Sequence, residues 1–172
     1  MKAIILTTDR FEEAELLVPY YRLQEEGVQV DIVALARAAI RGKHGYPVTP
    51  ARAAGEVQPG DYQLLVIPGG GAPELLADDK TACRIVEWFF EQNKPVAAIC
   101  HGPLLLSRLG LLVDRHVTGH ESIAYEVRAG RAHFVDREVM VDDGLITSRK
   151  PADLPAFMRE VVKAVHRIRP AG

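Results

Sequence analysis

Short apolar runs, separated by longer segments with helical spacing, recur along this chain. Four of these runs predict buried strands, at Ala3–Thr7, Val28–Leu35, Leu64–Ile67 and Val96–Ile99. Each run is short and is bounded by glycine, proline or polar residues, which favours a strand over a helix. Because strands that alternate with helices form right-handed crossovers, the pattern predicts an α/β fold with a mostly parallel sheet.

Apolar residues three and four positions apart predict three helices. The first follows Asp9 as its N-cap and ends at Gly27, and Pro19 is expected to kink it. Its expected inward positions are Phe11, Ala14, Leu17, Val18 and Tyr21. The second helix spans about residues 80–92, and the third, which has the clearest spacing, runs from Leu154 to Ile168.

Two further segments predict hairpins rather than crossovers. Glycines and prolines interrupt residues 37–60, where Ala39–Arg41 is expected to pair with Val48–Ala51. Later, residues 139–147 carry an Asp-Gly dipeptide between two apolar runs, which is typical of a tight hairpin turn.

The composition indicates an ordinary globular chain. Its 172 residues are 48% apolar and 26% charged, and they predict a single domain over residues 1–172. A formal charge of −2 argues against a nucleic-acid partner and against binding to an anionic membrane. No apolar run approaches the ~20 residues of a membrane span, and the N-terminal run is too short for a signal peptide.

The two cysteines, Cys83 and Cys100, are too few for a disulfide framework, so we expect free thiols in the reducing cytoplasm. No spacing of cysteines and histidines is typical of zinc, and we expect neither a metal nor another cofactor. Cys83 falls on the apolar face of the second helix and is expected to pack in the core.

Cys100 ends the strand Val96–Ile99 and stands directly before His101, Gly102 and Pro103. Because proline suits the first turn of a helix, the cysteine is expected at a strand-to-helix corner, where several hydrolase folds carry a nucleophile. The N-terminus of a helix favours an anion, so we expect a lowered pKa for this thiol. A buried structural cysteine is the plain alternative.

Residues with useful chemistry also follow two other strands, at Asp9–Glu12 and Gly69–Glu74. In an open parallel sheet ligands gather at the carboxyl ends of the strands, so these segments are expected beside Cys100. Glu12 is a candidate partner of the thiol, and the glycine run is a candidate oxyanion hole. An ordinary helix start and a tight turn would have the same sequences. His101 is a candidate general base, although the ring of a sequence neighbour need not face the thiol.

Five motifs then connect the chain to a known family. They are Phe11–Leu16, Gly42–Gly45, Pro68–Glu74, Ala98–Pro103 and Ser148–Leu154. With these motifs in this order, the chain resembles the PfpI-type intracellular cysteine proteases of the ThiJ/PfpI superfamily over essentially its whole length. The resemblance implies a flavodoxin-like three-layer sandwich, with a mostly parallel central sheet, helices on both faces and a nucleophile elbow.

The resemblance also implies roles for individual residues. Cys100 would be the nucleophile, paired with the adjacent His101. Glu74, supplied by a neighbouring subunit, would orient that histidine, and Glu12 would hydrogen-bond the thiol. The family therefore implies a homo-oligomer, a dimer or a hexamer, with the active site near a subunit interface.

The resemblance implies a surrounding pocket as well. The N–H groups of Gly70 and His101 would form the oxyanion hole, and Gly69 and His120 would line the substrate pocket. Close relatives often carry an aromatic residue where this chain has His120, a departure that bears on which substrate is preferred rather than on the core chemistry.

Three functions remain open from the sequence. The first is a cysteine-dependent hydrolase of peptides, in which the Cys100 thiolate attacks a carbonyl and His101 moves the proton. The alternative is a deglycase or glyoxalase acting on small carbonyl adducts of methylglyoxal, with Glu12 as acid and base. The third is a redox-sensing stress protein or chaperone that uses oxidation of Cys100. A glutaminase is excluded, because no His-x-Glu pair occurs late in the chain.

Overall fold

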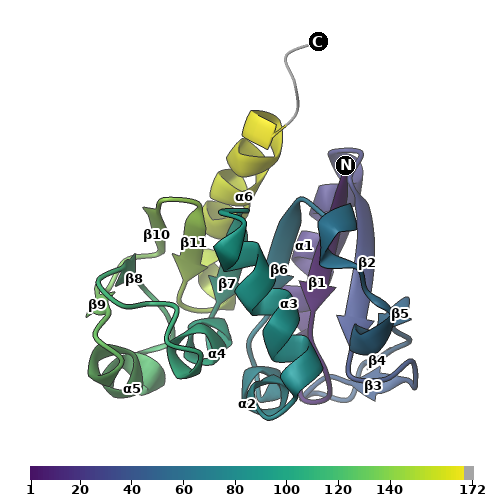
Figure 1. Ribbon diagram of the computed structural model, residues 1–172, viewed down its shortest axis with the longest axis horizontal. Helices are drawn as coiled ribbons and strands as arrows, with labels where there is room; N and C mark the ends of the chain where they lie inside the picture. Colours follow the sequence, from purple (N-terminus) through teal and green to yellow (C-terminus); the bar gives the residue numbers. More distant parts are fainter. Residues whose placement is uncertain (169–172) are drawn as a thin grey trace.

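The computed structural model describes residues 1–168, and its centre is a seven-stranded sheet between two layers of helices (Figure 1). All neighbouring strands are parallel except the edge strand β10, which pairs antiparallel with β11. In spatial order the strands are β10 (Val139–Asp142), β11 (Leu145–Ser148), β7 (Val96–Ile99), β6 (Leu64–Ile67), β1 (Lys2–Leu6), β2 (Gln29–Ala34) and β5 (Arg52–Ala53). The predicted α/β sandwich with a mostly parallel sheet is confirmed.

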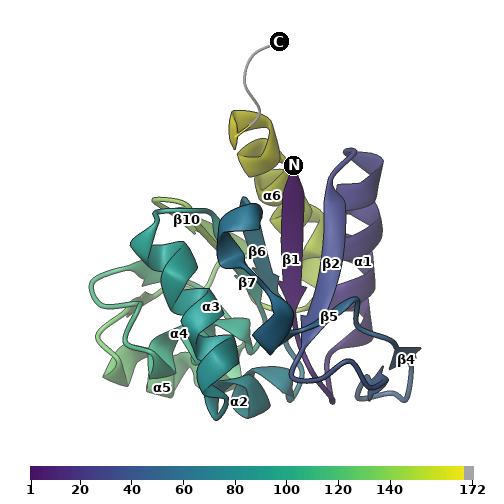
Figure 2. The same cartoon turned by 45° about the vertical axis from the view of Figure 1, so that its right-hand side comes forward.

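Helices cover both faces of this sheet (Figure 2). One face carries α2 (Ala72–Ala77), α3 (Lys80–Glu91), α4 (Gly102–Arg108) and α5 (Ala124–Ala129). The other face carries α1 (Glu13–Glu25) and α6 (Leu154–Ile168). The second and third predicted helices are therefore confirmed, as α3 and α6. The prediction of one domain over residues 1–172 includes residues 169–172, which lie outside the described residues.

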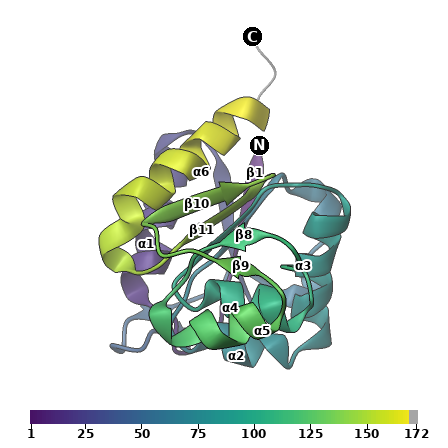
Figure 3. The same ribbon diagram turned by 90° about the vertical axis from the view of Figure 1, so that its left-hand side faces the viewer.

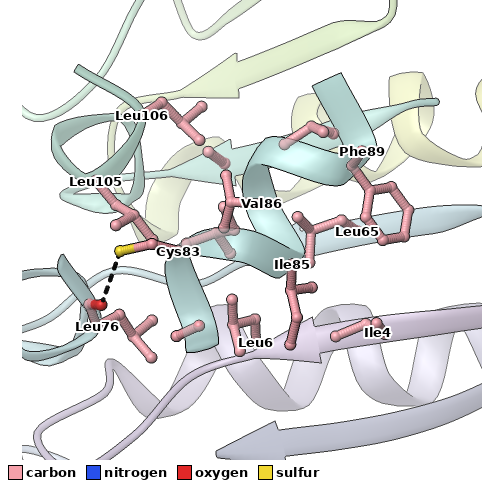
Figure 4. Close-up of a cluster of buried hydrophobic side chains, with 14 of the residues drawn as sticks. Ile4, Leu6, Leu65, Leu76, Cys83, Ile85, Val86, Phe89, Leu105 and Leu106 are labelled. Carbon is pink, nitrogen blue, oxygen red and sulfur yellow. Dashed lines mark hydrogen bonds between the residues drawn. The ribbon is translucent and has the colours of Figure 1, made fainter. Parts of the chain in front are cut away.

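The two faces bury separate hydrophobic cores because successive strand residues point to opposite sides. In β1, Ile4 and Leu6 pack with α3, whereas Ala3 and Ile5 pack with α1 and α6. Figure 4 shows the core under α3, where Cys83 lies among apolar side chains and its thiol donates to the Leu76 carbonyl at 3.5 Å. The predicted packing role of Cys83 is confirmed.

Two small two-stranded sheets flank the main one. β3 (Ile40–Arg41) pairs antiparallel with β4 (Pro47–Val48), so the early hairpin is confirmed with a shorter second strand than predicted. β8 (His116–Val117) pairs with β9 (His133–Phe134) beside the β10 edge of the molecule (Figure 3). The late hairpin is confirmed as β10 and β11. Short 3₁₀ helices span Ala54–Glu56, Pro59–Asp61, Glu121–Ile123 and Pro151–Asp153.

The start of the first helix was predicted wrongly. Asp9 does not cap α1; its Oδ1 accepts the Arg41 N–H at 2.8 Å, and the helix begins four residues later, at Glu13. The predicted inward face is also displaced, because Val18 and Tyr21 are exposed. Gly27 does follow the last turn, with a φ of +70° that suits glycine.

None of the helices within residues 1–168 is both long and apolar enough to cross a bilayer.

Candidate active site

Three neighbouring strands, β7, β6 and β1, bring their carboxyl ends to one edge of the sheet. The loops after β1 and β6 are joined by backbone hydrogen bonds: the Gly71 N–H donates to the Arg10 carbonyl at 2.8 Å, and the Glu12 N–H donates to the Gly69 carbonyl at 3.2 Å. Cys100 follows β7 directly. The predicted meeting of the three segments is therefore observed.

Cys100 occupies a strained corner between β7 and α4. Its φ is +62°, in the left-handed region that costs about 1–3 kcal/mol for a residue with a side chain. Two backbone hydrogen bonds hold this conformation: the Cys100 N–H donates to the Ser148 carbonyl at 3.0 Å, and the His120 N–H donates to the Cys100 carbonyl at 2.9 Å. Pro103 lies in the first turn of α4, as predicted. The geometry is that of a nucleophile elbow.

The imidazole of His101 faces the thiol. Its Nδ1 lies 3.2 Å from the Cys100 sulfur, and its Nε2 lies 3.0 Å from the Ser122 hydroxyl. Partial burial and the nearby His120 lower the pKa of His101, so the ring is neutral at pH 7 and able to accept a proton. Adjacency in sequence left this orientation open, and the structure provides the geometry that a general base needs.

The carboxyl group against the thiol belongs to Glu15 and not, as predicted, to Glu12. Glu15 lies in the first turn of α1 and is fully buried; its Oε2 accepts the Gly69 N–H at 2.8 Å, and its side chain contacts the Cys100 thiol. Glu12 instead pairs with Lys43. Because α1 begins at Glu13, the side chain of Glu15 lies on the face of the helix that is turned towards the sheet.

Burial raises the pKa of Glu15 to about 7, and the neighbouring Glu12 carboxylate adds to the rise. The Oε1 atom of Glu15 is buried and makes no hydrogen bond of standard geometry within residues 1–168. Glu15 therefore changes protonation near neutral pH, where a carboxyl group can both accept and donate a proton.

The predicted lowering of the Cys100 pKa is wrong. Burial, and then the Glu15 carboxylate, raise the pKa of this thiol, and they outweigh the backbone N–H groups that favour the thiolate. Cys100 is 6% exposed. Because a protonated and poorly exposed thiol reacts slowly with oxidants, the site does not favour a redox sensor. Nδ1 of His101, 3.2 Å from the sulfur, lies within reach of the thiol proton.

The backbone N–H groups of Gly70 and His101 both favour the thiolate form of Cys100 and partly offset the rise in its pKa. Gly70 adopts a φ of +77°, and a Cβ there would lie 2.3 Å from the Arg10 carbonyl oxygen, so glycine is required for this approach. Two donors that converge beside a nucleophile have the arrangement of an oxyanion hole.

A pocket of about 410 Å³ opens above the thiol. Its lining residues come from the three loops, from the turn between β3 and β4, from α2, and from the segments around the 3₁₀ helices Glu121–Ile123 and Pro151–Asp153: Glu12, Lys43, Gly70, Gly71, Glu74, Cys100, His101, His120, Lys150 and Pro151. His120 lines it as predicted. Gly69 does not; it lies beneath the pocket floor, where a Cβ would meet the Cys100 Cβ at 2.6 Å. Glu74 is exposed at the rim and, within the described part of the chain, makes no hydrogen bond to His101.

Ligand atoms of Glu12, Glu13 and His44 lie within 4.8 Å of one another, the one such group found among the described residues. These carboxylates already have protein partners, since Glu12 pairs with Lys43 and Glu13 accepts both the backbone N–H of His44 at 2.7 Å and a contact with its ring at 2.8 Å. The set therefore offers no site that is free for a cation.

A match to the DJ-1/PfpI family covers residues 1–164. The chain belongs to the DJ-1/PfpI family. The resemblance inferred from the motifs is therefore confirmed. "Deglycase TK1284" of Thermococcus kodakarensis is 44% identical over 163 residues, covering 95% of this chain and 98% of that protein. "Deglycase PfpI" of Pyrococcus furiosus is 42% identical over 163 residues, with the same coverage.

A solved structure has the same fold. It is a two-domain protein from Anabaena variabilis with DJ-1/ThiJ/PfpI-like and ferritin-like domains, which aligns with a TM-score of 0.93 at 30% identity. The alignment covers 96% of this chain and 48% of that chain. Among the functions left open by the sequence, the names of the relatives favour the deglycase alternative over the peptidase, which was the first choice.

Sequence reasoning missed two residues of the site, Glu15 and Ser122. Glu15 is one of several glutamates at the start of α1, and only the helix phase distinguishes it. A correct N-cap at Glu12 would have placed Glu15 on the same side as the buried Leu16 and Pro19. Ser122 carries no signal of its own, because it depends on a short 3₁₀ turn after His120.

Proposed function

We propose that the protein is a cysteine-dependent deglycase that removes early methylglyoxal adducts from amino groups and releases lactate. The observation that carries this proposal is the buried Glu15 carboxyl, with a pKa of about 7, in contact with the Cys100 thiol. Peptide hydrolysis needs only a nucleophile, a base and an oxyanion hole, whereas conversion of a methylglyoxal adduct to lactate also needs a proton moved between two carbons. The names of the two relatives support the same choice.

The first step would exchange nitrogen for sulfur. The adduct is R–NH–CH(OH)–CO–CH₃, and the Cys100 sulfur bonds to the carbon that carries the nitrogen as the C–N bond breaks. His101, whose Nδ1 lies 3.2 Å from the sulfur, takes the thiol proton and passes it to the leaving amine. The products are the free amine and the enzyme hemithioacetal.

The second step would move a proton within that hemithioacetal. Glu15 takes the proton from the sulfur-bearing carbon, which gives an enediolate, and returns it to the neighbouring carbon. The hydroxyl proton passes from the oxygen of the first carbon to the oxygen of the second, so that CH(OH)–CO–CH₃ becomes CO–CH(OH)–CH₃. The N–H groups of Gly70 and His101 stabilise the oxygen that is negative in between. Water then cleaves the resulting thioester, which yields lactate and restores the thiol.

The decisive experiment compares lactate release from methylglyoxal-treated N-acetyl-lysine with proteolysis of casein, on one preparation. Cys100→Ser is expected to abolish lactate release, and Glu15→Gln to lower it at least ~100-fold, because general acid–base catalysis is lost. Cys83→Ser, which changes a buried thiol 17 positions away in the α3 core, is the matched control. Full lactate release by Glu15→Gln, or casein cleavage without lactate release, would overturn the proposal.

We infer further that the protein forms a dimer or hexamer with the site near a subunit interface. Its support is the position of Glu74, exposed at the pocket rim, where a neighbouring copy could approach. Sedimentation of wild type and Glu74→Arg measures this: the variant is expected to dissociate or to lose activity, and an unchanged active assembly would contradict the role of Glu74.

We also propose a cytoplasmic location. Its support is that both cysteines are free thiols, as a reducing compartment would keep them.

A further inference from the structure

The hydroxyl of Ser122 lies between two imidazole rings. Its oxygen is 3.0 Å from Nε2 of His101 and 2.8 Å from Nδ1 of His120. The two rings are stacked, with centroids 4.8 Å apart and planes 20° from parallel. Ser122 thus connects the candidate base to a second histidine through one exchangeable proton.

The direction of this network follows from a backbone hydrogen bond. The Ser122 N–H can only donate, and it donates to Nδ1 of His120 at 3.2 Å. In a neutral imidazole one nitrogen donates and the other accepts. Nδ1 of His120 is therefore the acceptor, and the proton of this ring sits on Nε2.

The hydroxyl must then donate towards His120. A serine has one O–H proton, and the only way for its oxygen to hydrogen-bond an acceptor nitrogen is to donate that proton. Towards His101 the same oxygen can offer only a lone pair, so Nε2 of His101 carries the ring proton. Nδ1 of His101 is left unprotonated, and it is the atom that faces the Cys100 sulfur at 3.2 Å.

We propose that Ser122 is a positioning residue that holds His101 in the tautomer with a free lone pair on Nδ1, and that His120 orients Ser122. The inference deepens the proposed function, on which the assignment of His101 as the base rests. It places the group that orients His101 within the same chain, where the sequence had suggested Glu74 of a neighbouring subunit. Ser122 is itself exposed on the 3₁₀ turn Glu121–Ile123, so its side chain can be changed without disturbing the core.

The test measures the tautomer directly. Ring-¹⁵N spectra of histidine-labelled full-length protein, assigned with His101→Gln and His120→Gln, report which nitrogen carries the proton. Wild type is expected to show His101 protonated on Nε2 only. Ser122→Ala should give mixed tautomers at His101 and a fall in kcat/KM of about tenfold, chiefly in kcat, whereas Ser122→Thr, which keeps the hydroxyl, should restore both.

The control is Ser107→Ala, which removes a hydroxyl bonded to the Glu126 carbonyl at 3.5 Å, outside the site. It should leave the His101 spectrum and kcat/KM unchanged. The inference is overturned if His101 in Ser122→Ala stays protonated on Nε2 only. If Glu74→Gln then gives mixed tautomers, the group that orients His101 is Glu74 and not Ser122.

The spectrum needs no substrate, so the two proposals fail separately. If the tautomer responds to Ser122 while no lactate is released, the positioning role holds and the deglycase proposal fails. If lactate is released while Ser122→Ala leaves the tautomer of His101 unchanged, the deglycase proposal holds and the positioning role fails.

Discussion

Glu15 and Cys100 share a buried space in which both favour their protonated forms. Burial raises the pKa of both groups, and the Glu15 carboxylate raises the pKa of Cys100 further, whereas the hydrogen bond from the Cys100 thiol lowers the pKa of Glu15. The fold tolerates an ionised Glu15 only at a cost. That cost makes the stability of the molecule sensitive to pH.

The free energy of unfolding should therefore fall as pH rises through 7. The pKa of Glu15 is about 7 in the folded protein and about 4.5 when unfolded, so its contribution is complete below pH 4.5 and is lost above pH 7. Glu15→Gln cannot ionise, and above pH 7 it should be more stable than wild type by up to about 3 kcal/mol. Urea unfolding at several pH values measures this. A difference that is constant with pH would contradict it.

Gly69 packs closely against the side chains of Glu15 and Cys100. A Cβ at this position would lie 2.6 Å from both the Cys100 Cβ and Oε2 of Glu15. Gly69→Ala should lower the free energy of unfolding by about 1–3 kcal/mol and reduce activity, because both groups must shift. Gly55→Ala, with no atom within 4 Å of its Cβ, is the control and should change stability by less than about 0.5 kcal/mol. Equal effects of the two substitutions would refute the argument.

Among the residues of the site, the sequence identified the cysteine at the elbow but not the carboxyl group that contacts its thiol. Cys100 was identifiable because a buried strand, a cysteine and a Pro103-initiated helix are local features of the chain. The choice between Glu12 and Glu15 was not local. That choice depended on whether the helix starts near Asp9 or at Glu13, because moving the start by a few residues changes which carboxylate faces the sheet.

Among the elements, α3 shows how a single cap defines a helix. Asp79 accepts the N–H groups of Thr81 and Ala82 through one carboxylate oxygen, at 2.9 and 2.8 Å. This satisfies two of the donors that a helix start leaves without partners.

Removing this cap should destabilise the protein without touching the site. Asp79→Ala should lower the free energy of unfolding by about 1 kcal/mol, while Asp79→Ser, which retains a capping oxygen, should lose less. Chemical denaturation of the three proteins measures the order. The neighbouring Asp78, which does not cap α3, provides the control: Asp78→Ala should be nearly neutral. An equal loss at both positions would argue against the capping role.

Long, strongly periodic elements were predictable, and short ones were not. α3 and α6 were predicted within a residue or two because each buries a continuous apolar stripe. α2 was missed because its six residues follow a glycine run and include Pro73, which together favour a loop. β5, β8 and β9 have two residues each, too few for any period to be visible.

On the scale of the molecule, the sheet separates two cores that have no side chain in common among residues 1–168. Val86 of α3 is fully buried on one face, and Val161 of α6 is fully buried on the other. Side chains in one core therefore have no direct packing contact with those in the other.

Substitutions in the two cores should consequently add. Val86→Ala and Val161→Ala should each lower the free energy of unfolding by about 2 kcal/mol, since each deletes two buried methyl groups. The double variant should lose the sum to within about 0.5 kcal/mol. A double-mutant cycle in urea measures the coupling, and Val86→Ala with Leu105→Ala, both in the α3 core, is the comparison in which coupling is expected. Strong coupling across the sheet would contradict two independent cores.

The thiols of Cys83 and Cys100 differ in the sequence separation of the polar groups that they contact. Cys83 contacts the carbonyls of Leu76 and Ala77, seven and six positions away, whereas Cys100 is enclosed by Glu15 and by the loop at Gly69. Contacts between distant residues form later, since the chain must first close large loops. During refolding, pulses of a thiol-alkylating reagent should therefore find Cys83 protected before Cys100. Protection of Cys100 thus reports when α1 and the loop after β6 have docked against the end of β7.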